Sequence, residues 1–525
     1  MEPKSPSKAK LPILGFFHHF RVLKSGIVIV VVVLLLLILI GYYYLIRNPR
    51  FPTYFTVVID CGSSGTRVNI YEWMWMSNRN PELPILLHSF PDNSTKNHDR
   101  KHGCAYHCMQ TEPGLDQFVG NSSGVRASLE PLIRRAEKWV PYERHIATPI
   151  FVLATAGLRR LGENMASRVL DDVEGVVRSH KFNYRKDWIR VLSGREEAYY
   201  GWIALNYHMG VFKNSSSLPT LGLLDLGGSS LQVATEIKEP TAGVFRSNIG
   251  SFEIFADSLP DFGLNEAFDR TVVMLSHSHS RKGDLGIYEI GHPCLGDGFM
   301  QNYTCHGCME NKISSLHLFG EPNWEKCKEL ARAAAINSKL NREKMVSLIG
   351  GSHSVARFHA LSGFFAVYNL LNLNAEEANV SNIWEKGEKL CSRSLTGLTL
   401  TNMGINQNQK YADFLCFRVP YMVSVIENVV CVGDKDIIFG PGDVSWTLGA
   451  ALVEGKDLWG IDTSKAKSIS IFSYFRFKRL IFSPYFVFFI LVILLFVVYR
   501  SQIKLPMLGR KPRQHYSFGP KRRPV

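Results

Sequence analysis

Two long uncharged apolar runs frame the chain, residues 26–46 and residues 481–499. A helix rises about 1.5 Å per residue, so each run is long enough to cross the hydrocarbon core of a bilayer. We predict two transmembrane helices, the first an uncleaved signal anchor because it ends on aromatic residues where a cleavage site needs small ones. Cleavage of the first run and burial of the second as a core helix are the alternatives.

Between these runs, one pattern of apolar and small residues occurs twice and predicts two β-hairpins. Residues 55–60 form a β-branched run that ends in Asp60, residues 61–66 form a glycine-serine turn, and an alternating strand follows at 67–71. At a distance of 165 residues, a strand ending in Asp225, a turn at 226–230 and a strand at 231–235 repeat the pattern. We interpret this as an internal duplication of a hairpin.

Two further segments lie between these hairpins and predict strands that run into helices. Residues 149–161 place Thr155 and Arg159 at the carboxyl end of a strand, where α/β proteins bind ligands. Packing of the strand end against a helix is an equal explanation for Arg159. Residues 188–202 place Glu196 and Glu197 at a helix N-terminus. The helix dipole alone favours acids there, so capping is the simple explanation, and a general base is the functional one.

The two turns carry the residue types of a phosphate-binding loop. Glycines allow consecutive backbone N–H groups to converge on an anion, and serine hydroxyls add donors. The aspartate that opens each turn is suited to holding Mg²⁺ or Ca²⁺ through water. Two such loops facing each other would bind a polyphosphate from both sides. No Walker loop and no dinucleotide-binding glycine motif is present in the sequence.

The charge distribution excludes a nucleic-acid partner for the body of the chain. The 525 residues are 46% hydrophobic and carry a net charge of +14. The basic residues gather in the two tails and before the second apolar run, whereas residues 25–464 sum to −3. The positive-inside rule therefore places both termini in the cytosol and the body in the lumen or outside the cell.

Cysteines and glycosylation sequons agree with a secretory location, in the Golgi or the plasma membrane. All ten cysteines lie between the apolar runs, so we expect disulfides, with connectivity left open. Cys305 and Cys308 are expected to join Cys294 and Cys327 in a structural cluster, while Cys61 is expected to be a buried free thiol. The five sequons also lie between the runs, at Asn93, Asn121, Asn214, Asn302 and Asn379.

The order and wording of these segments resemble the apyrase family of nucleoside tri- and diphosphate diphosphohydrolases. The resemblance covers residues 55–452 and includes the segments 112–115 and 443–451. The sequence Ser-Gly-Arg-Glu-Glu-Ala-Tyr-Tyr-Gly-Trp at 193–202 is similar to the membrane-bound plant branch in particular. The resemblance implies an α/β, actin-like fold of two lobes, each with a ribonuclease-H-like core, and hydrolysis of phosphoanhydrides with Ca²⁺ or Mg²⁺.

The resemblance also implies roles for individual residues. Glu197 matches the general base; Thr155, Ser230 and Gln232 match residues that place the attacking water; Asp60 and Asp225 match acids that hold the metal through water. The phosphate-binding set is Gly62, Ser63, Ser64, Gly65, Thr66, Arg67, Gly227, Gly228 and Ser229. Tyr421 fits a family position for stacking on the base. The expected segments are tail 1–25, span 26–46, first lobe 47–185, second lobe 186–440, return to the first lobe 441–464, span 481–499 and tail 500–525.

Two residues depart from the family pattern. Ala198 replaces a common glycine after the base, so the backbone there must be one that alanine tolerates. Arg195 replaces a common glutamine, and its charge would either lower the pKa of the base or bind a phosphate oxygen. The expected reaction is in-line attack of water on nucleoside tri- and diphosphates, giving nucleoside monophosphate and phosphate. The alternatives are a phosphotransferase or coupled ATPase on the same fold and a non-catalytic nucleotide-binding receptor, and the spans would also permit a homo-oligomer.

Overall fold

The structure is a computed structural model that describes residues 53–459. Within this range it leaves out 75–82, 92–109, 214–218, 238–244, 247–251, 280, 283–287, 305–315, 337–356, 374–378, 392–412 and 433–436. The two predicted membrane spans and the predicted tails lie outside the described residues. Among the helices that are described, none has the length and apolar character needed to cross a bilayer.

The first sheet is built on the first predicted hairpin, which the structure confirms. The strands occur in the order β3 (Ile85–Phe90), β2 (Gly65–Met74), β1 (Thr53–Gly62), β5 (Ile150–Ala154) and β6 (Ile189–Val191), with β4 (Gln110–Thr111) beside β2. β1 is antiparallel to β2 and parallel to β5, which is parallel to β6. Because β6 is an edge strand of this sheet, the sheet continues past residue 185, where the first lobe was expected to end.

Helices cover both faces of this sheet, so its central strands are apolar at consecutive positions. Val57 and Ile59 of β1 pack into the cluster shared with α3 (Ser122–Trp139) and α5 (Glu163–Val177). Val58, between them, packs on the opposite side with residues of α6 (Gly194–His208) and α15 (Trp446–Trp459). Alternation of side chains along the strand thus supplies two cores from one run.

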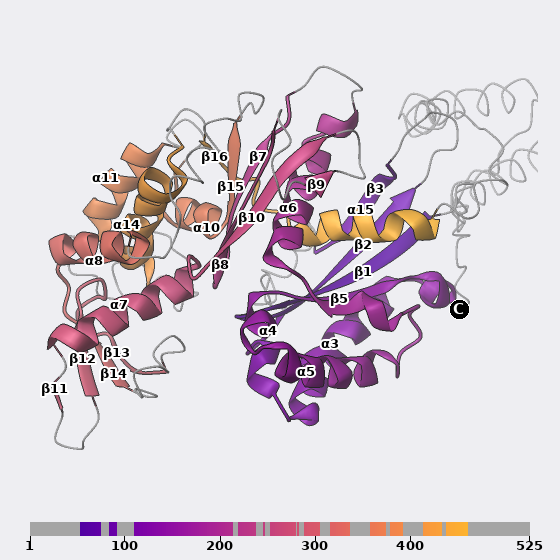
Figure 1. Cartoon of the computed structure of the whole chain (residues 1–525), viewed down its shortest axis with the longest axis horizontal. Coiled ribbons are helices and arrows are strands. Elements are labelled where there is room, and N and C mark those ends of the chain that lie inside the picture. The colour runs from indigo at the N-terminus through magenta and orange to yellow at the C-terminus, as the bar shows by residue number, and fades with distance from the viewer. Residues whose placement is uncertain are drawn as a thin grey trace, which may run out of the picture. The chain divides into compact units, whose positions relative to one another are not determined.

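The second sheet repeats the first. Its order is β16 (Ile437–Phe439), β15 (Phe358–Ser362), β7 (Gly222–Leu226), β8 (Ser230–Glu236), β10 (Glu253–Pro260) and β9 (Phe245–Arg246). β8 is antiparallel to both β7 and β10, and β15 and β16 continue the sheet on the other side of β7 as parallel strands. The first sheet has the same arrangement around β1. The duplication predicted from the hairpins therefore extends to the sheets around them (Figure 1).

Further helices, short helical turns and a small third sheet complete the fold. The third sheet has four strands, in the order β11 (Arg281–Lys282), β12 (Tyr288–His292), β14 (Leu316–Gly320) and β13 (Met300–Tyr303). The remaining α-helices are α4 (Ala156–Arg160), α7 (Leu264–His279), α8 (Trp324–Ile336), α10 (Gly363–Leu370), α11 (Val380–Cys391) and α14 (Leu415–Val425). Short 3-10 helices occur at Leu115–Phe118, Tyr142–Ala147, Lys186–Trp188 and Val211–Lys213, and a short π-helix at Ile426–Val430. Disulfides join Cys294 to Cys327 and Cys391 to Cys416. Cys61 is a buried free thiol, as predicted.

Two helices, α6 and α15, cross at a very short distance. A Cβ atom added at Gly449 of α15 would lie 1.9 Å from the backbone oxygen of Tyr200 in α6. On the other side of α6, a Cβ atom at Gly201 would lie 2.6 Å from Leu223 Cδ2 in β7. Since α15 also packs on β1, these glycines let α6 approach elements of both sheets.

We expect Gly449→Ala to destabilise the protein by about 1–3 kcal/mol, because the added methyl group meets a fixed backbone oxygen. Thermal unfolding would measure the loss as a lower Tm. Gly175→Ala in α5 is the matched control, because no atom lies within 4 Å of its added Cβ. That control should be neutral or slightly stabilising, since alanine has the higher helix propensity. An equal Tm for the two variants would contradict the proposed close crossing.

Candidate active site

The first of the paired glutamates, Glu196, caps helix α6. Ser193 Oγ accepts from the Glu196 backbone N–H at 3.2 Å, and Glu196 Oε2 accepts from the Ser193 N–H at 2.8 Å. Its other oxygen accepts from Arg190 Nη1 at 2.8 Å. Burial opposes ionisation, but the hydrogen bonds from Ser193 and the charge of Arg190 outweigh it and lower the pKa of Glu196. The capping explanation therefore holds for this residue.

The second glutamate, Glu197, faces a different environment. Both Arg159 Nη1 and Nη2 donate to its Oε2 at 3.0 Å, and neither contact involves Oε1. Arg159 Nη1 also donates to the Leu192 carbonyl at 2.8 Å, which fixes the guanidinium. Burial raises the pKa of Glu197 to about 7; Arg159 opposes this rise, and the charges of Asp60 and Asp225 add to it. A carboxyl group half-ionised near neutral pH is suited to accept and release a proton.

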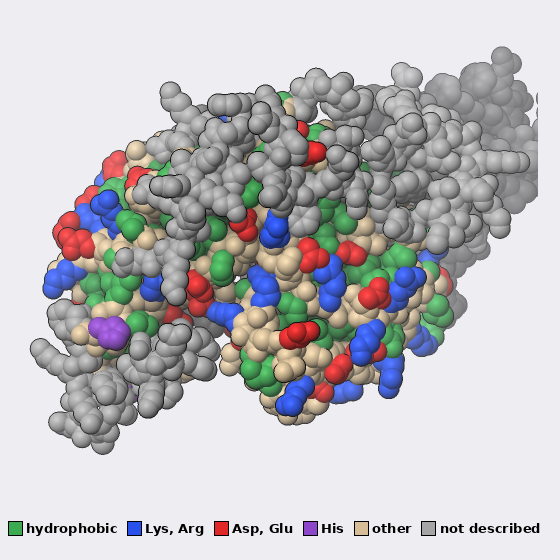
Figure 2. All heavy atoms as spheres, in the orientation of Figure 1, with side chains coloured by type: hydrophobic (Ala, Val, Ile, Leu, Met, Phe, Trp, Pro, Cys, Tyr) green, Lys and Arg blue, Asp and Glu red, His purple; other side chains and the backbone are tan. Residues whose placement is uncertain are grey.

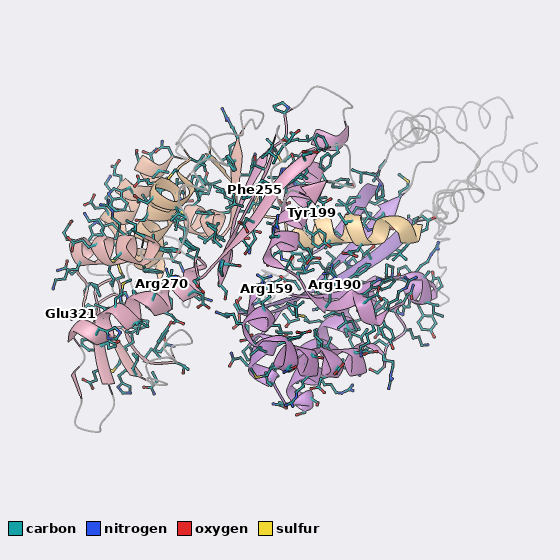
Figure 3. All side chains as sticks on the ribbon, in the orientation of Figure 1. Arg159, Arg190, Tyr199, Phe255, Arg270 and Glu321 are labelled. Atoms are coloured by element: carbon teal, nitrogen blue, oxygen red, sulfur yellow. A yellow bond between two sulfur atoms is a disulfide. The ribbon has the colours of Figure 1, made fainter. Side chains whose placement is uncertain are left out.

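The arginine that acts on this carboxylate is Arg159 and not Arg195. Arg195 Nε donates to the Ala256 carbonyl in β10 at 3.2 Å. Arg159 and Arg190, both labelled in Figure 3, belong to the half of the molecule that carries the first sheet. Ala198 is buried within α6, where alanine is the most favourable residue.

The first glycine-serine loop joins β1 to β2 and brings Asp60 opposite Arg67. Arg67 Nη1 lies 3.4 Å from Asp60 Oδ2, and Arg67 Nε donates to Gln110 Oε1 at 2.9 Å. Burial raises the pKa of Asp60; the charge of Arg67 opposes this rise, and that of Asp225 adds to it. A Cβ at Gly114 would lie 2.7 Å from the Gly62 and Ser63 carbonyls, so the chain around Gly114 supports this loop from behind.

The second loop joins β7 to β8 and is supported in the same way. Asp225 lies opposite Gln232 in the strand register, as Asp60 lies opposite Arg67. The N–H groups of Leu264 and Asn265 donate to the carbonyls of Gly227 and Gly228 at 3.0 and 2.8 Å. A Cβ at Gly263 would lie 2.2 Å from the nitrogen of Ser229. Burial raises the pKa of Asp225 against an opposing hydrogen bond from Ser362.

The two loops meet. A Cβ placed on Gly228 would lie 3.4 Å from Ser63 Oγ. Glu266 of α7 accepts from Ser229 Oγ at 3.3 Å and pairs with Arg160 of α4, which joins the second loop to the helix after β5. Thr155 begins that helix and donates its backbone N–H to the Cys61 carbonyl at 3.1 Å. In Figure 2 the surface is hollowed between the part that carries α7 and the part that carries α4, with acidic and basic side chains along the margin.

The remaining positions of the predicted set fall around these loops. Ser64 Oγ accepts from Arg67 Nη2 at 3.5 Å, and Thr66 is fully buried beside Cys61. Gly65 has φ of 156°, and an added Cβ there would lie 2.6 Å from the Thr111 carbonyl. Gly65 thus admits the close approach of β4 behind the first loop, which a side chain would block.

The acids of the site fit a hydrated divalent cation. Asp60, Asp225 and Glu197 influence one another's charge, yet the described part of the chain contains no group of three or more acid, histidine or cysteine side chains close enough to hold a metal directly. Burial raises the pKa of Asp60 and of Asp225, so negative charge there is under-compensated. Mg²⁺ takes oxygen ligands and keeps several of its waters when bound, so carboxylates are able to hold it through water.

A buried polar cluster lies on the strands that follow the second loop. Gln232 Nε2 donates to Ser230 Oγ at 2.6 Å and to Ser258 Oγ at 3.1 Å. Ser258 comes from β10 and was not among the predicted site residues. No local motif marks it, because its place in the site arises from strand pairing across 26 residues.

The prediction for Tyr421 is wrong. Its ring is fully buried, stacks on Phe417 with centroids 5.4 Å apart, and its hydroxyl donates to the Phe262 carbonyl at 2.7 Å. The ring and the hydroxyl of Tyr421 therefore both have partners within the hydrophobic core. No face of the ring is open to a nucleobase.

Comparison with known proteins agrees with this geometry. The family model described as GDA1/CD39 (nucleoside phosphatase) matches residues 51–459. A relative called probable apyrase 7, from Arabidopsis thaliana, is 38% identical over 430 residues, which are 77% of this chain but 57% of that protein. Ectonucleoside triphosphate diphosphohydrolase 1 from Bos taurus is 25% identical over 76% of this chain and 80% of its own.

A solved structure shows the same fold. The structure is of nucleoside triphosphate hydrolases from Neospora caninum; it covers 81% of this chain and 97% of that chain with a TM-score of 0.52 and 15% sequence identity. This agreement, with the repeated sheets, supports the actin-like α/β part of the fold prediction. The predicted terminal helices remain outside the described residues.

The raised pKa of Glu197 has a consequence for stability that is independent of catalysis. With a folded pKa of about 7 and a reference value of 4.5, the folded protein holds the proton that the unfolded chain has lost between these pH values. Stability attributable to this group therefore falls as pH rises through this window. Glutamine resembles the protonated form.

The free energy of unfolding of Glu197→Gln, relative to that of the native protein, should increase by about 2 kcal/mol as the pH rises from 5 to 8. Denaturant unfolding in the presence of a chelator would measure the difference. Glu196→Gln is the control and should lose about 1 kcal/mol at pH 8, because it removes a half-exposed charge that pairs with Arg190 and favours the helix N-terminus. A Glu197→Gln difference that does not change with pH would show that Glu197 ionises normally.

Proposed function

The chain belongs to the GDA1/CD39 (nucleoside phosphatase) family, and we propose that it is a membrane-anchored apyrase. It hydrolyses the phosphoanhydride bonds of nucleoside tri- and diphosphates, releasing phosphate and leaving the nucleoside monophosphate. The observation that carries the proposal is Glu197, a buried carboxyl with a pKa of about 7 that lies among the acids of two facing glycine-serine loops.

The two loops would hold the phosphates from opposite sides. Each loop supplies backbone N–H groups and serine hydroxyls, and Arg67 adds a cation at the first. Gly114 and Gly263 press on the loops from behind, which keeps the backbone in one shape before substrate arrives. Pre-arranged donors avoid a cost of reorganisation when charge develops on the phosphoryl oxygens.

Ca²⁺ or Mg²⁺ is the proposed cofactor, held through water by Asp60 and Asp225. When bound, the cation supplies charge neutralisation and polarises the phosphoryl oxygens. The support is the burial of both carboxyl groups at the facing loops, which removes water from them and raises the pKa of each, so that a cation beside them would be favourable. Arg67 compensates Asp60 only in part, at 3.4 Å and from one guanidinium nitrogen.

Glu197 acts as the general base. Arg159 occupies Oε2, so Oε1 is the oxygen that accepts the proton of the attacking water. Thr155, Ser230 and Gln232 place that water; their side chains are 5%, 4% and 2% exposed, so bulk solvent does not compete for them. A base with a pKa near the working pH combines a large deprotonated fraction with useful basicity.

We further propose that the body lies in the lumen of the secretory pathway or outside the cell, anchored by the runs 26–46 and 481–499. The two disulfides among the described residues favour an oxidising compartment. Asn121 and Asn302, two of the sequon residues, are exposed and accessible to a glycosyltransferase.

Phosphate release by the purified full-length protein tests the proposed reaction. The panel is ATP, ADP, UDP, GDP and AMP, each with Ca²⁺, with Mg²⁺ and with a chelator. Metal-dependent release from the tri- and diphosphates but not from AMP supports an apyrase. Release that needs an added acceptor would favour a phosphotransferase, and binding without release a nucleotide receptor.

We expect Glu197→Gln to lower kcat by roughly 100-fold or more, with nucleotide affinity nearly unchanged, because an amide cannot accept the proton. Steady-state kinetics and equilibrium nucleotide binding measure the two effects separately. Glu196→Gln is the matched control on the adjacent residue and should stay within a few-fold of the native kcat. If both variants kept native turnover, the base would have to be another residue.

Arg159→Gln should move the acidic limb of the pH dependence of kcat/KM to higher pH. The cation stabilises the ionised form of Glu197, so its removal raises the pKa of the base further above about 7. A shift of about one unit is the expected size. Arg195→Gln, which removes an arginine that contacts β10 instead, should leave the limb in place. A shift in the Arg195 variant alone would reverse these assignments.

A further inference from the structure

We propose that Ser258 is a positioning residue for the hydrolytic water, because it fixes the side-chain amide of Gln232 in the orientation that offers its oxygen to that water. The proposal rests on the proposed function and adds a residue to it. The juxtaposition that carries it is Ser258 on β10, opposite Gln232 on β8 and beneath the first turn of the helix that bears Glu197.

The hydrogen bonds of Gln232 define which end of its amide faces the cleft. Its Nε2 donates to Ser230 Oγ at 2.6 Å and to Ser258 Oγ at 3.1 Å. A primary amide nitrogen has two hydrogens, so these two bonds use its donor capacity. Gln232 is 2% exposed, so these two contacts, and not solvent, set the position of its amide. The carbonyl oxygen Oε1 is thus the group left to accept a hydrogen bond.

An accepting group is what the attacking water needs. A water that donates one hydrogen to Glu197 and the other to Gln232 Oε1 directs a lone pair at phosphorus. Were the amide flipped, its N–H would compete for that lone pair. With Ser230 as its only partner, the amide would be free to turn about that one hydrogen bond. Ser258 adds the second bond that fixes the orientation.

The position of Ser258 also joins the water-placing strand to the base helix. A Cβ on Gly194, the first residue of α6, would lie 2.3 Å from Ser258 Cβ, so the helix rests directly on this serine. One residue along α6, Arg195 Nε donates to the Ala256 carbonyl of the same strand at 3.2 Å. Phe255, labelled in Figure 3, marks this part of β10. The same segment of β10 therefore contacts both Gln232 and the helix that carries Glu197.

The duplicated first sheet provides an internal comparison. Arg67 stands seven residues after Asp60, as Gln232 stands seven after Asp225. Arg67 is held by Gln110, its partner on the adjoining strand β4, at 2.9 Å. Both hairpins thus use a polar side chain on the third strand to orient the residue that follows the loop. In the second hairpin that side chain is Ser258.

The test measures kcat and KM of the full-length protein with its best nucleotide and metal. We expect Ser258→Ala to lower kcat about 10-fold with KM within two-fold, because the water is misplaced while the phosphates are still held. Ser89→Ala on β3, outside the site, is the control and should leave both constants unchanged. Ser258→Cys keeps the size but is a weak acceptor, so its kcat should fall between native and alanine.

A double-mutant cycle separates positioning from a general structural role. In a Gln232→Ala background, Ser258→Ala should cause no further loss of kcat, because the amide it orients is gone. Equal losses in both backgrounds, or a native kcat in Ser258→Ala, would overturn the inference. If the native protein releases no phosphate from any nucleotide, the proposed function itself fails, and that result is distinct from an active enzyme indifferent to Ser258.

Discussion

The burial of three carboxylates in one place is the constraint on which the rest of this site depends. Asp60, Asp225 and Glu197 each have a raised pKa because burial removes water from a charged group. The fold tolerates this arrangement because one arginine offsets it at Asp60, another at Glu197, and a serine does so at Asp225. The compensation is incomplete, because the pKa of each carboxyl group stays above its ordinary value. In the proposed function, a cation at the aspartates and a proton at Glu197 offset the charge that is left.

The duplicated sheets explain how such a cluster can be assembled from local parts. Each sheet presents an aspartate at the end of a strand and a glycine-serine turn beyond it, so two copies facing each other create a binding site for a chain of phosphates. The copies differ at the residue opposite the aspartate, which is Arg67 in one and Gln232 in the other. A guanidinium suits the binding of phosphate, whereas an amide suits the placement of water. In the proposed function, this difference gives the duplicated scaffold a half that binds phosphate and a half that places the water.

Local patterns were sufficient for the parts of the site that lie within one turn or one helix end. The two hairpins, the free thiol at Cys61 and the capping role of Glu196 follow from neighbours in sequence. Arg159 remained ambiguous because its partner Glu197 is 38 residues away, and Ser258 left no trace in any motif. Tyr421 was misplaced for the opposite reason: an aromatic residue on a helix looks the same in sequence whether it packs inside or stacks on a ligand. Burial, which decides between the two, is a property of the folded chain.

Helix α6 shows why these distant contacts matter more than the motif itself. Its first turn carries the cap, the proposed base and the arginine that contacts β10, while its middle is in close contact with Gly449 and with Leu223. The base is thus set by contacts with both sheets, and any relative shift of the sheets changes its distance from the phosphate loops. Since a buried carboxylate is sensitive to each nearby charge, such a shift would alter its pKa as well as its position. Geometry and basicity of Glu197 are therefore coupled through one helix, and close glycine packing is the feature that keeps both fixed.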